Sequence, residues 1–524
     1  MLHVSILVEL LRARPALTVA MAALAQAAVW TLVPALFYAG PPGNLPAVLA
    51  VGHEFQLGTY LGPPLAFWLA EIVFRATGRS LLAIYALSQI CVVVTYWAMF
   101  RLGRAIVGRR QAAIAVLLMI GVSTFTVATP EFGPVILTLP LWGLALLHYW
   151  RVVAERRPRY GYALAFDIAL ILITTYAGAV LVGLLLLFTL LNARTRALLR
   201  LPDLWPAGLA AVLLIPNLYW LVTTSDQFFA MLARLRSADA VAGNMTGWLR
   251  QLALIVGAHA GLIVLIGIVI GFPWEKHEPA PVIVRRSVEP FARRFVYFFT
   301  FMPALLATVA GVVGGASDPV GGIAPLVVLS GLAVVIAAGD AIALSHQRGV
   351  IATWFGLLLV PPALAVVALV ALPWLGIDLA VNQPAAAMGR FFADSFARRI
   401  GKDLPIVAGD PRTAALVELG AASRPSLFLP ATPERSPWVS MRDVMQKGAI
   451  LVWPTTDTAG TPPPDIKADF PDIVPEVPRA FERTVQGRLP LLRIGWAVIR
   501  PAAAPPDAPV QVPAAPDPSP DPKP

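Results

Sequence analysis

The sequence predicts an α-helical polytopic membrane protein with about eleven transmembrane helices, followed by a small α/β domain. Three observations support this fold class. Hydrophobic residues make up 58% of the 524 residues and charged residues only 13%, whereas soluble domains are usually about 45–50% apolar and about 25% charged. The apolar residues form long runs separated by arginine-rich segments. After residue 375 these runs give way to short β-rich and helical patterns.

The predicted transmembrane helices follow one another from the N-terminus. A window of about 19 residues identifies the runs that can cross the hydrocarbon core of a bilayer. These runs lie near residues 17–38, 81–100, 112–128, 132–150, 160–176, 177–191, 207–222, 252–272, 295–313, 323–344 and 350–372. The first run is too long for a signal peptide, so we expect an uncleaved span. The short pair between residues 160 and 191 could also form one tilted helix.

The placement of arginine selects eleven spans rather than ten and gives the orientation. With eleven spans, most loop arginines fall on one side, in clusters such as 101–110, 151–159 and 285–294. The loops of the other side contain only Arg75, Arg79, Arg234, Arg236 and Arg250. Basic loops stay in the cytoplasm. We therefore predict a cytoplasmic N-terminus, outer loops at 39–80 and 224–250, and a periplasmic C-terminal domain. The Ala- and Arg-rich composition fits a bacterium of high genomic GC and so predicts the inner membrane.

Three units follow from these patterns: a transmembrane domain (1–375), a soluble periplasmic α/β domain (376–500) and a disordered Pro- and Ala-rich tail (501–524). In the α/β domain, LPIVAGD (404–410) predicts a strand and PRTAALVELG predicts a helix that ends at Gly420. PSLFLP and GAILVWP predict further strands, a helix is expected near 439–446, and LLRIGWAVIR predicts a last strand.

Composition also narrows the function. The net charge of +10 is spread between apolar runs rather than gathered on a soluble face, which argues against a nucleic-acid partner. The single cysteine, Cys91, excludes an intramolecular disulfide and a thiol metal site. The acidic and histidine residues of EKHE (275–278) are not spaced like a zinc site. The sequence therefore assigns no metal-ligating residues and no certain cofactor, and dependence on a divalent metal stays open.

The segment HEFQLGTYLGPPLAFWL (53–69) contains more than a connecting loop needs. It places His53 and Glu54 before Pro63, Pro64 and an aromatic helix start. This order resembles the first outer loop of the GT-C membrane glycosyltransferases, in particular the bacterial branch related to protein O-mannosyltransferases and lipid A aminoarabinose transferases. The segments ATPEFGPVILTLPLW (128–142), TTYAG (174–178) and IPNLYWLVTTSDQF (215–228) extend the resemblance. It covers roughly residues 10–370 and implies a GT-C-like fold there.

The resemblance implies inverting transfer of a sugar from a polyprenyl-phosphate donor to an envelope acceptor (a lipid, glycan or protein) at the outer leaflet. The acceptor hydroxyl needs a base within hydrogen-bond reach, and the leaving lipid phosphate needs cationic or donor groups. The candidate catalytic residues are Glu54, His53 and Glu131. The candidate substrate-binding residues are Tyr60, Trp68, Tyr176, Arg234 and Arg236.

The loop departs from the family pattern at three positions. His53 replaces the first acidic residue of the pair, Gly62 replaces the basic or amide residue before the two prolines, and Thr175 replaces the lysine of a TKY element. The base could be Glu54 supported by His53. It could also be His53 itself, because histidine changes charge near neutral pH. A diverged member with other substrates, or with no activity, is a further alternative.

Each candidate also has a structural interpretation. Glu131 stands at a helix start, where a carboxylate complements the helix dipole. The aromatic candidates suit an interfacial belt, and the two candidate arginines could meet lipid phosphates nonspecifically. Two other functions compete with sugar transfer: a transporter or flippase of lipid-linked sugars, and a catalytically silent scaffold. Asp167 and Asp340 are the visible acids in the spans, fewer than transport usually needs.

Overall fold

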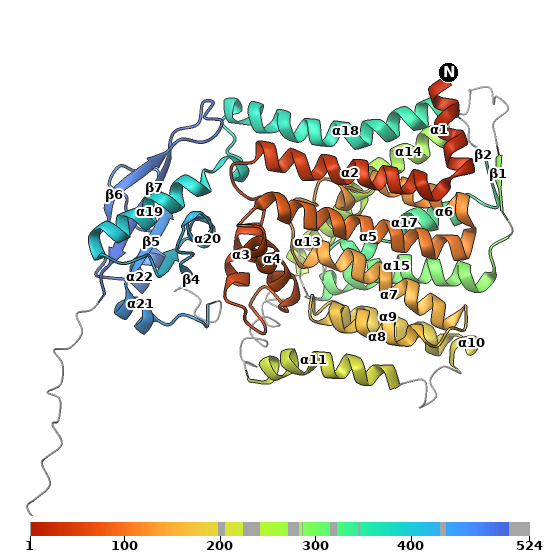
Figure 1. The fold of residues 1–524 in the computed structure, drawn as a ribbon, viewed down its shortest axis with the longest axis horizontal. Helices are drawn as coiled ribbons and strands as arrows, with labels where there is room; N and C mark the ends of the chain where they lie inside the picture. The colour runs from red at the N-terminus through yellow and green to blue at the C-terminus, as the bar shows by residue number, and fades with distance from the viewer. Residues whose placement is uncertain are drawn as a thin grey trace, which may run out of the picture.

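The computed structural model describes residues 2–196, 205–223, 241–270, 282–285, 287–314, 322–343, 346–429 and 436–501. Long helices lie side by side in a bundle, with a mixed sheet beyond one end and the N-terminal helix across the other (Figure 1). Two short helices of the first outer loop lie between the bundle and the sheet (Figure 1). The expected combination of an α-helical bundle and a C-terminal α/β part is therefore present.

The predicted run 112–128 is only partly α-helical, because the α-helix there ends at Leu118 and two short 3-10 helices follow, Met119–Gly121 and Ser123–Phe125. Apart from α1 and α10, the bundle is built from helices that overlap the predicted runs. The helices of the bundle are α1 (Leu2–Ala13), α2 (Pro15–Phe37), α5 (Leu81–Val107), α6 (Arg109–Leu118), α7 (Pro134–Val153), α8 (Tyr160–Leu172), α9 (Gly178–Leu191), α10 (Ala193–Arg196), α11 (Trp205–Thr223), α13 (Val241–Ala258), α14 (Ala260–Ile270), α15 (Pro290–Gly314), α16 (Ala324–Val327), α17 (Ser330–Ala337) and α18 (Gln347–Ala371). A short antiparallel pair, β1 (Val282–Val284) and β2 (Ala341–Ala343), joins two of the connections.

Four of the described helices are individually long and apolar enough to cross a membrane: Pro15–Phe37, Leu81–Val107, Pro134–Val153 and Gln347–Leu375. Met245–Ala258 and Ala260–Ile270 together would form a fifth span, bent by 52°. The shorter apolar helices are Tyr160–Leu172, Gly178–Leu191, Ala210–Thr223 and Ala324–Ala337. The break between α8 and α9 agrees with two separate elements there. The count of eleven spans stays a prediction.

The loop predicted to be the first outer one (39–80) is largely helical. It contains α3 (Leu45–His53) and α4 (Leu65–Ala76), which pack against each other. Apolar residues of α4 recur at helical spacing, with Ala66, Phe67, Ala70 and Phe74 buried. At nine and twelve residues, the two helices are too short to span a bilayer, which needs about 20 residues. They form a platform at the end of the bundle.

The C-terminal part is a mixed five-stranded sheet in the order β4-β3-β5-β7-β6. Its elements are α19 (Ala385–Ile400), β3 (Ile406–Gly409), α20 (Pro411–Gly420), β4 (Ser426–Phe428), α21 (Met441–Lys447), β5 (Ala449–Pro454), α22 (Pro464–Asp469), β6 (Glu476–Phe481) and β7 (Leu492–Ile499). β3 pairs in parallel with β4 and β5, whereas β7 pairs antiparallel with β5 and β6. The four expected strands and two expected helices are found.

The sheet is covered on both faces, as its sequence requires. Alternate residues of a strand point to opposite faces, so in β5 Ile450 and Val452 pack with α19 and α20. Leu451 and Trp453 join the other core, with α21 and α22. Sequence analysis did not identify α19, α22 or β6. The proposed tail lies outside the described residues from 502 onward, and the domain boundaries at 375 and 500 stay predictions.

Candidate active site

The loop between α3 and α4 is held from several sides. The indole Nε1 of Trp68 donates to the carbonyl of Gln56 (2.9 Å), and the side-chain amide of Asn217 in α11 donates to the carbonyl of Leu57 (3.0 Å). The Leu65 N–H donates to the carbonyl of Ile173 at the end of α8 (2.9 Å). These contacts seat the loop against one end of α8 and α11. Its backbone therefore has little freedom to rearrange.

Gly62 occupies a backbone conformation that other residues rarely adopt. A tight turn joins Thr59 and Gly62 through two backbone hydrogen bonds of 3.0 and 3.1 Å, and φ of Gly62 is +139°. Only glycine adopts such a φ without strain. A Cβ at this position would meet no atom within 4 Å, so the backbone rather than crowding selects glycine. The missing basic residue is thus a consequence of the turn.

Glu54 follows directly after α3 and is half-buried. Its Oε1 is buried and has no hydrogen-bond partner among the described residues. Burial raises the pKa of Glu54, while a hydrogen bond from Ser426 and the nearby charges of His53, Arg424 and Arg75 act in the opposite direction. A raised pKa brings a carboxylate nearer to the range in which general bases work. Of the predicted acids, Glu54 has the environment that best suits a base.

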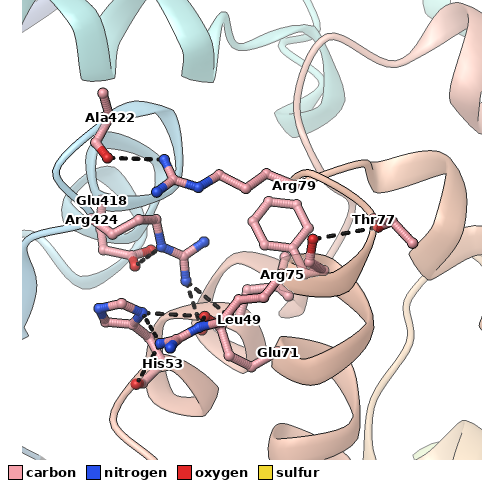
Figure 2. Close-up of polar contacts among 10 residues, drawn as sticks. Leu49, His53, Glu71, Arg75, Thr77, Arg79, Glu418, Ala422 and Arg424 are labelled. Carbon is pink, nitrogen blue, oxygen red and sulfur yellow. Dashed lines mark hydrogen bonds and ion pairs between the residues drawn. The ribbon is translucent and has the colours of Figure 1, made fainter.

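His53 belongs to a charged cluster that joins α3 and α4 to the C-terminal sheet domain. We call His53, Glu71, Arg75, Glu418 and Arg424 the interface cluster. Figure 2 shows Glu418 and Arg424 of the C-terminal domain facing His53, Glu71 and Arg75 of the loop. Arg424 donates to Glu71 (3.0 Å), and its Nε lies 2.7 Å from a Glu418 oxygen. Glu71 and Glu418 are 1% and 0% exposed, so the buried charge of Glu71 depends on Arg424 for compensation.

The interface cluster restricts what His53 can do. Its Nδ1 lies 3.2 Å from Glu71 Oε1 and 2.8 Å from Arg75 Nη2. A ring nitrogen either donates or accepts, so Nδ1 donates to Glu71 when it carries a proton and accepts from Arg75 when it does not. Any proton transfer with a substrate would therefore use Nε2. The geometry favours a supporting role for His53.

Glu131 lies at the opposite end of α3 from Glu54. Its Oε1 accepts a hydrogen bond from the N–H of Asn44 (2.7 Å), the residue that precedes α3. The nine residues of α3 place its two ends about 13 Å apart at 1.5 Å per residue. The two carboxylates are therefore held at different ends of α3, and a shared cavity lined by Glu54 and Glu131 stays a prediction. The contact with Asn44 agrees with the alternative of a helix-terminal carboxylate.

The remaining candidates divide between the loop and its surroundings. Tyr60 packs against both the bundle core and the sheet core, and Trp68 fixes the loop through Gln56. Tyr176 lies beside Asn217 at the end of α8. Arg234 and Arg236 lie outside the described residues. No group of three His, Cys, Asp or Glu side chains that could hold a metal ion occurs within the described ranges.

Sequence reasoning missed Glu71, Glu418 and Arg424. Glu71 carried a usable signal, because it is an acidic residue inside the apolar pattern of α4, four residues before Arg75. Arg424 carried no such signal. It is 353 residues from Glu71 in sequence, and no local pattern relates the two positions.

The acids predicted inside the spans are both paired. Asp167 of α8 contacts His148 of α7, and Asp340 lies 3.2 Å from Arg285. Asp167 and Arg285 are the buried members of these pairs, and a buried charge in a membrane domain is costly unless it is paired. These pairs therefore have a sufficient structural role in holding neighbouring elements together.

Comparisons with known proteins agree with this architecture. Residues 62–220 match the family model described as dolichyl-phosphate-mannose-protein mannosyltransferase. The structure is similar to ArnT from Cupriavidus metallidurans bound to undecaprenyl phosphate, with a TM-score of 0.56 and 15% identity over 93% of this chain and 99% of ArnT. The apo state of ArnT gives a TM-score of 0.53 and 14% identity over 90% of this chain and 96% of that one.

No curated protein matches the chain in sequence. The family match begins at Gly62, just before the two prolines of the outer loop, and the structural match extends over almost the whole of both chains. The resemblance predicted from the outer loop is therefore confirmed: the chain has the fold of the GT-C membrane glycosyltransferases.

Proposed function

We propose that this protein is an integral-membrane glycosyltransferase that moves a sugar from a polyprenyl-phosphate donor to an envelope acceptor, with inversion, at the outer leaflet. The observation that carries the proposal is the structural similarity to ArnT over nearly the full length of both chains. The ArnT structure in this comparison is bound to undecaprenyl phosphate. The family match over residues 62–220 supports the same class of reaction. The acceptor can be a lipid, a glycan or a protein.

Glu54 is the proposed general base. It lies in a loop braced by α11 and the end of α8, and its unpartnered Oε1 can accept a proton. The acceptor hydroxyl would lose its proton to this carboxylate while its oxygen attacks the anomeric carbon and the lipid phosphate leaves. His53 supports the loop through Glu71, and Glu131 fixes the start of α3. Tyr60, Trp68 and Tyr176 would shape the sugar side of the site.

Two isosteric substitutions test the assignment. Glu54→Gln keeps the size of the side chain but removes its basicity, so turnover should fall by roughly 10²–10⁴-fold with little change in thermal stability. Glu131→Gln is the matched control, because an amide oxygen can still accept from the N–H of Asn44. The measurement is transfer of a labelled sugar from polyprenyl phosphate in proteoliposomes, after mass profiling of envelope lipids, glycans and glycoproteins has identified the product.

Near-normal transfer by Glu54→Gln would remove Glu54 from the mechanism. A large loss in Glu131→Gln with normal stability would move the base to the other end of α3. His53→Gln tests whether His53 is itself the base. Sugar transfer should be lost if His53 is the base, but only partly reduced if His53 has a supporting role that glutamine can partly fill. The proposed function itself would be refuted if cells with and without the chain had the same envelope lipids, glycans and glycoproteins.

A catalytically silent scaffold is the second candidate, favoured by one observation. The turn at Gly62 leaves no side chain where the family usually has a basic or amide residue before the two prolines. A scaffold would retain the interface cluster and the outer sheet domain but transfer no sugar. The transfer measurement above separates these two functions.

A further inference from the structure

An apolar groove lies at the end of the bundle far from the sheet domain. Its volume is about 630 Å³, within the range of roughly 300–1,000 Å³ that is typical of ligand pockets. Residues of α1, α2, α6, α14, α17 and α18 line it, and the polar lining residues are Thr18 and Gln347. Trp354 of α18 donates to the carbonyl of Leu117 in α6 (3.0 Å) and so ties two of its walls together.

The groove opens sideways. Met21 of α2, Ile270 of α14 and Phe355 of α18 all line it and are 53%, 70% and 41% exposed. In a chain that spans a membrane, such an opening faces the hydrocarbon of the bilayer. An apolar molecule can therefore enter from the membrane without crossing water.

The N-terminal helix closes one end of the groove. α1 runs across the ends of α2 and α18 rather than along them (Figure 1). Its Leu7, Val8 and Leu11 line the groove, while Glu9 and Arg12 form an ion pair. Its twelve residues extend about 18 Å, too short to cross a core of about 30 Å. An amphipathic helix in this position lies at the interface between hydrocarbon and headgroups.

Arginines stand at that same end. Arg14 is one helical turn before Thr18, and Arg110 is one turn before Ile114, and both Thr18 and Ile114 line the groove. The Arg110 Nε donates to the carbonyl of Arg12 (3.0 Å), which places Arg110 against the α1–α2 junction. Arg14 and Arg110 are exposed and form no ion pair within the described residues. The groove thus combines an apolar interior with a cationic rim.

We propose that this groove binds an anionic glycerophospholipid of the leaflet nearest the N-terminus, with its acyl chain between α2, α14 and α18 and its phosphate at Arg14 and Arg110. Apolar lining suits the chain, and two arginines at the interface suit the phosphate. The groove is lined by α1, which lies at the other end of the bundle from α3 (Figure 1), the helix that Glu54 directly follows. It is therefore independent of the proposed sugar transfer.

The test is native mass spectrometry of the full chain after delipidation and incubation with phosphatidylglycerol, phosphatidylcholine or undecaprenyl phosphate. Phosphatidylglycerol should bind at one saturable site. Ala25→Trp fills the groove and should abolish this binding, whereas Ala20→Trp, on the same helix, exposed and outside the lining, should not. If Ala25→Trp fails to fold, Ala22→Leu makes a smaller change in the same lining and should weaken the binding.

The charge contribution has its own pair of variants. Arg14→Gln combined with Arg110→Gln should weaken phosphatidylglycerol binding by roughly thirtyfold. Phosphatidylcholine, whose headgroup has no net charge, should bind more weakly from the start and lose less. Arg104→Gln is the control, because α5 contributes no residue to the groove. Equal retention of phosphatidylglycerol by Ala25→Trp and Ala20→Trp would mean that the lipid binds only nonspecifically around the protein, and it would overturn the proposal. Saturable binding of undecaprenyl phosphate without phosphatidylglycerol would overturn it as well, by assigning the groove to the donor carrier.

Discussion

At position 62 the conformation of the main chain decides which side chain is tolerated. We predict that Gly62→Lys, which restores the kind of residue common in the family, lowers both stability and sugar transfer. A non-glycine residue at φ +139° stores strain of about 1–3 kcal/mol, and the open space around the site cannot relieve it. Thermal unfolding in detergent and the proteoliposome assay measure the two effects.

Gly183 provides the matched control for this prediction. It lies inside α9, and a Cβ there would also meet no atom within 4 Å. Because alanine suits a helix better than glycine by about 1 kcal/mol, Gly183→Ala should maintain or raise the unfolding temperature. Increased transfer by Gly62→Lys would mean that the turn is not needed for activity.

Single residues also show how far the sequence leads. His53 and Glu54 could be located from the motif alone, because the order of acid, aromatics and prolines is local. The separation of Glu54 from Glu131 could not, since it depends on which end of α3 each side chain reaches. Local patterns do not encode such distances; they arise only when the helices pack.

At the level of elements, the contact of α20 with α3 and α4 should depend on pH. Burial raises the pKa of Glu418 to about 8, with Arg424 opposing the shift and Glu71 and Glu54 reinforcing it. The folded state then holds a proton that the unfolded chain releases near pH 4.3. The contribution of Glu418 to the free energy of unfolding is therefore fully present below about pH 4 and is lost as the pH rises towards 8.

Glu71 acts in the opposite direction. Hydrogen bonds and charges from His53, Arg424 and Arg75 outweigh its burial and lower its pKa, so its contribution is present at neutral pH and is lost in acid. Between pH 6 and 9 the slope should come from Glu418. Unfolding temperatures should fall more steeply over this interval in the native chain than in Glu418→Gln. Parallel slopes would show that Glu418 does not titrate there.

The elements that sequence analysis missed have physical reasons. β6 contains Pro478 and charged residues, which is unusual in a strand but tolerated at an edge, where β6 lies. α22 is only six residues long. In contrast, α20 was predicted with its end at Gly420, since Asp410 and Pro411 mark its start and the Asp410 carboxylate accepts from the Thr413 N–H.

For the whole molecule, the decisive prediction is topology. The arginine-rich loops place the N-terminus in the cytoplasm and the sheet domain in the periplasm. A reporter that is active only in the periplasm should be active when fused after Arg500 and silent when fused after Arg157. The reverse pattern would put Glu54 on the cytoplasmic side and exclude an outer-leaflet reaction. Fusions on either side of the α8–α9 break would test the count of eleven spans.

The pairing of Glu71 with Arg424 also has a consequence for how the protein is made. A ribosome that adds about 5–20 residues per second needs roughly 20–70 s to synthesise the 353 residues between the two partners. In the predicted topology, α4 crosses the membrane during that time without Arg424, which pairs with its buried Glu71. The N–H groups of Ala39 and Gly40 donate to the carbonyl of Val381. They lack this acceptor for almost as long, until Val381 has been synthesised. The loop between α2 and α5 therefore gains these contacts only after most of the chain has been made.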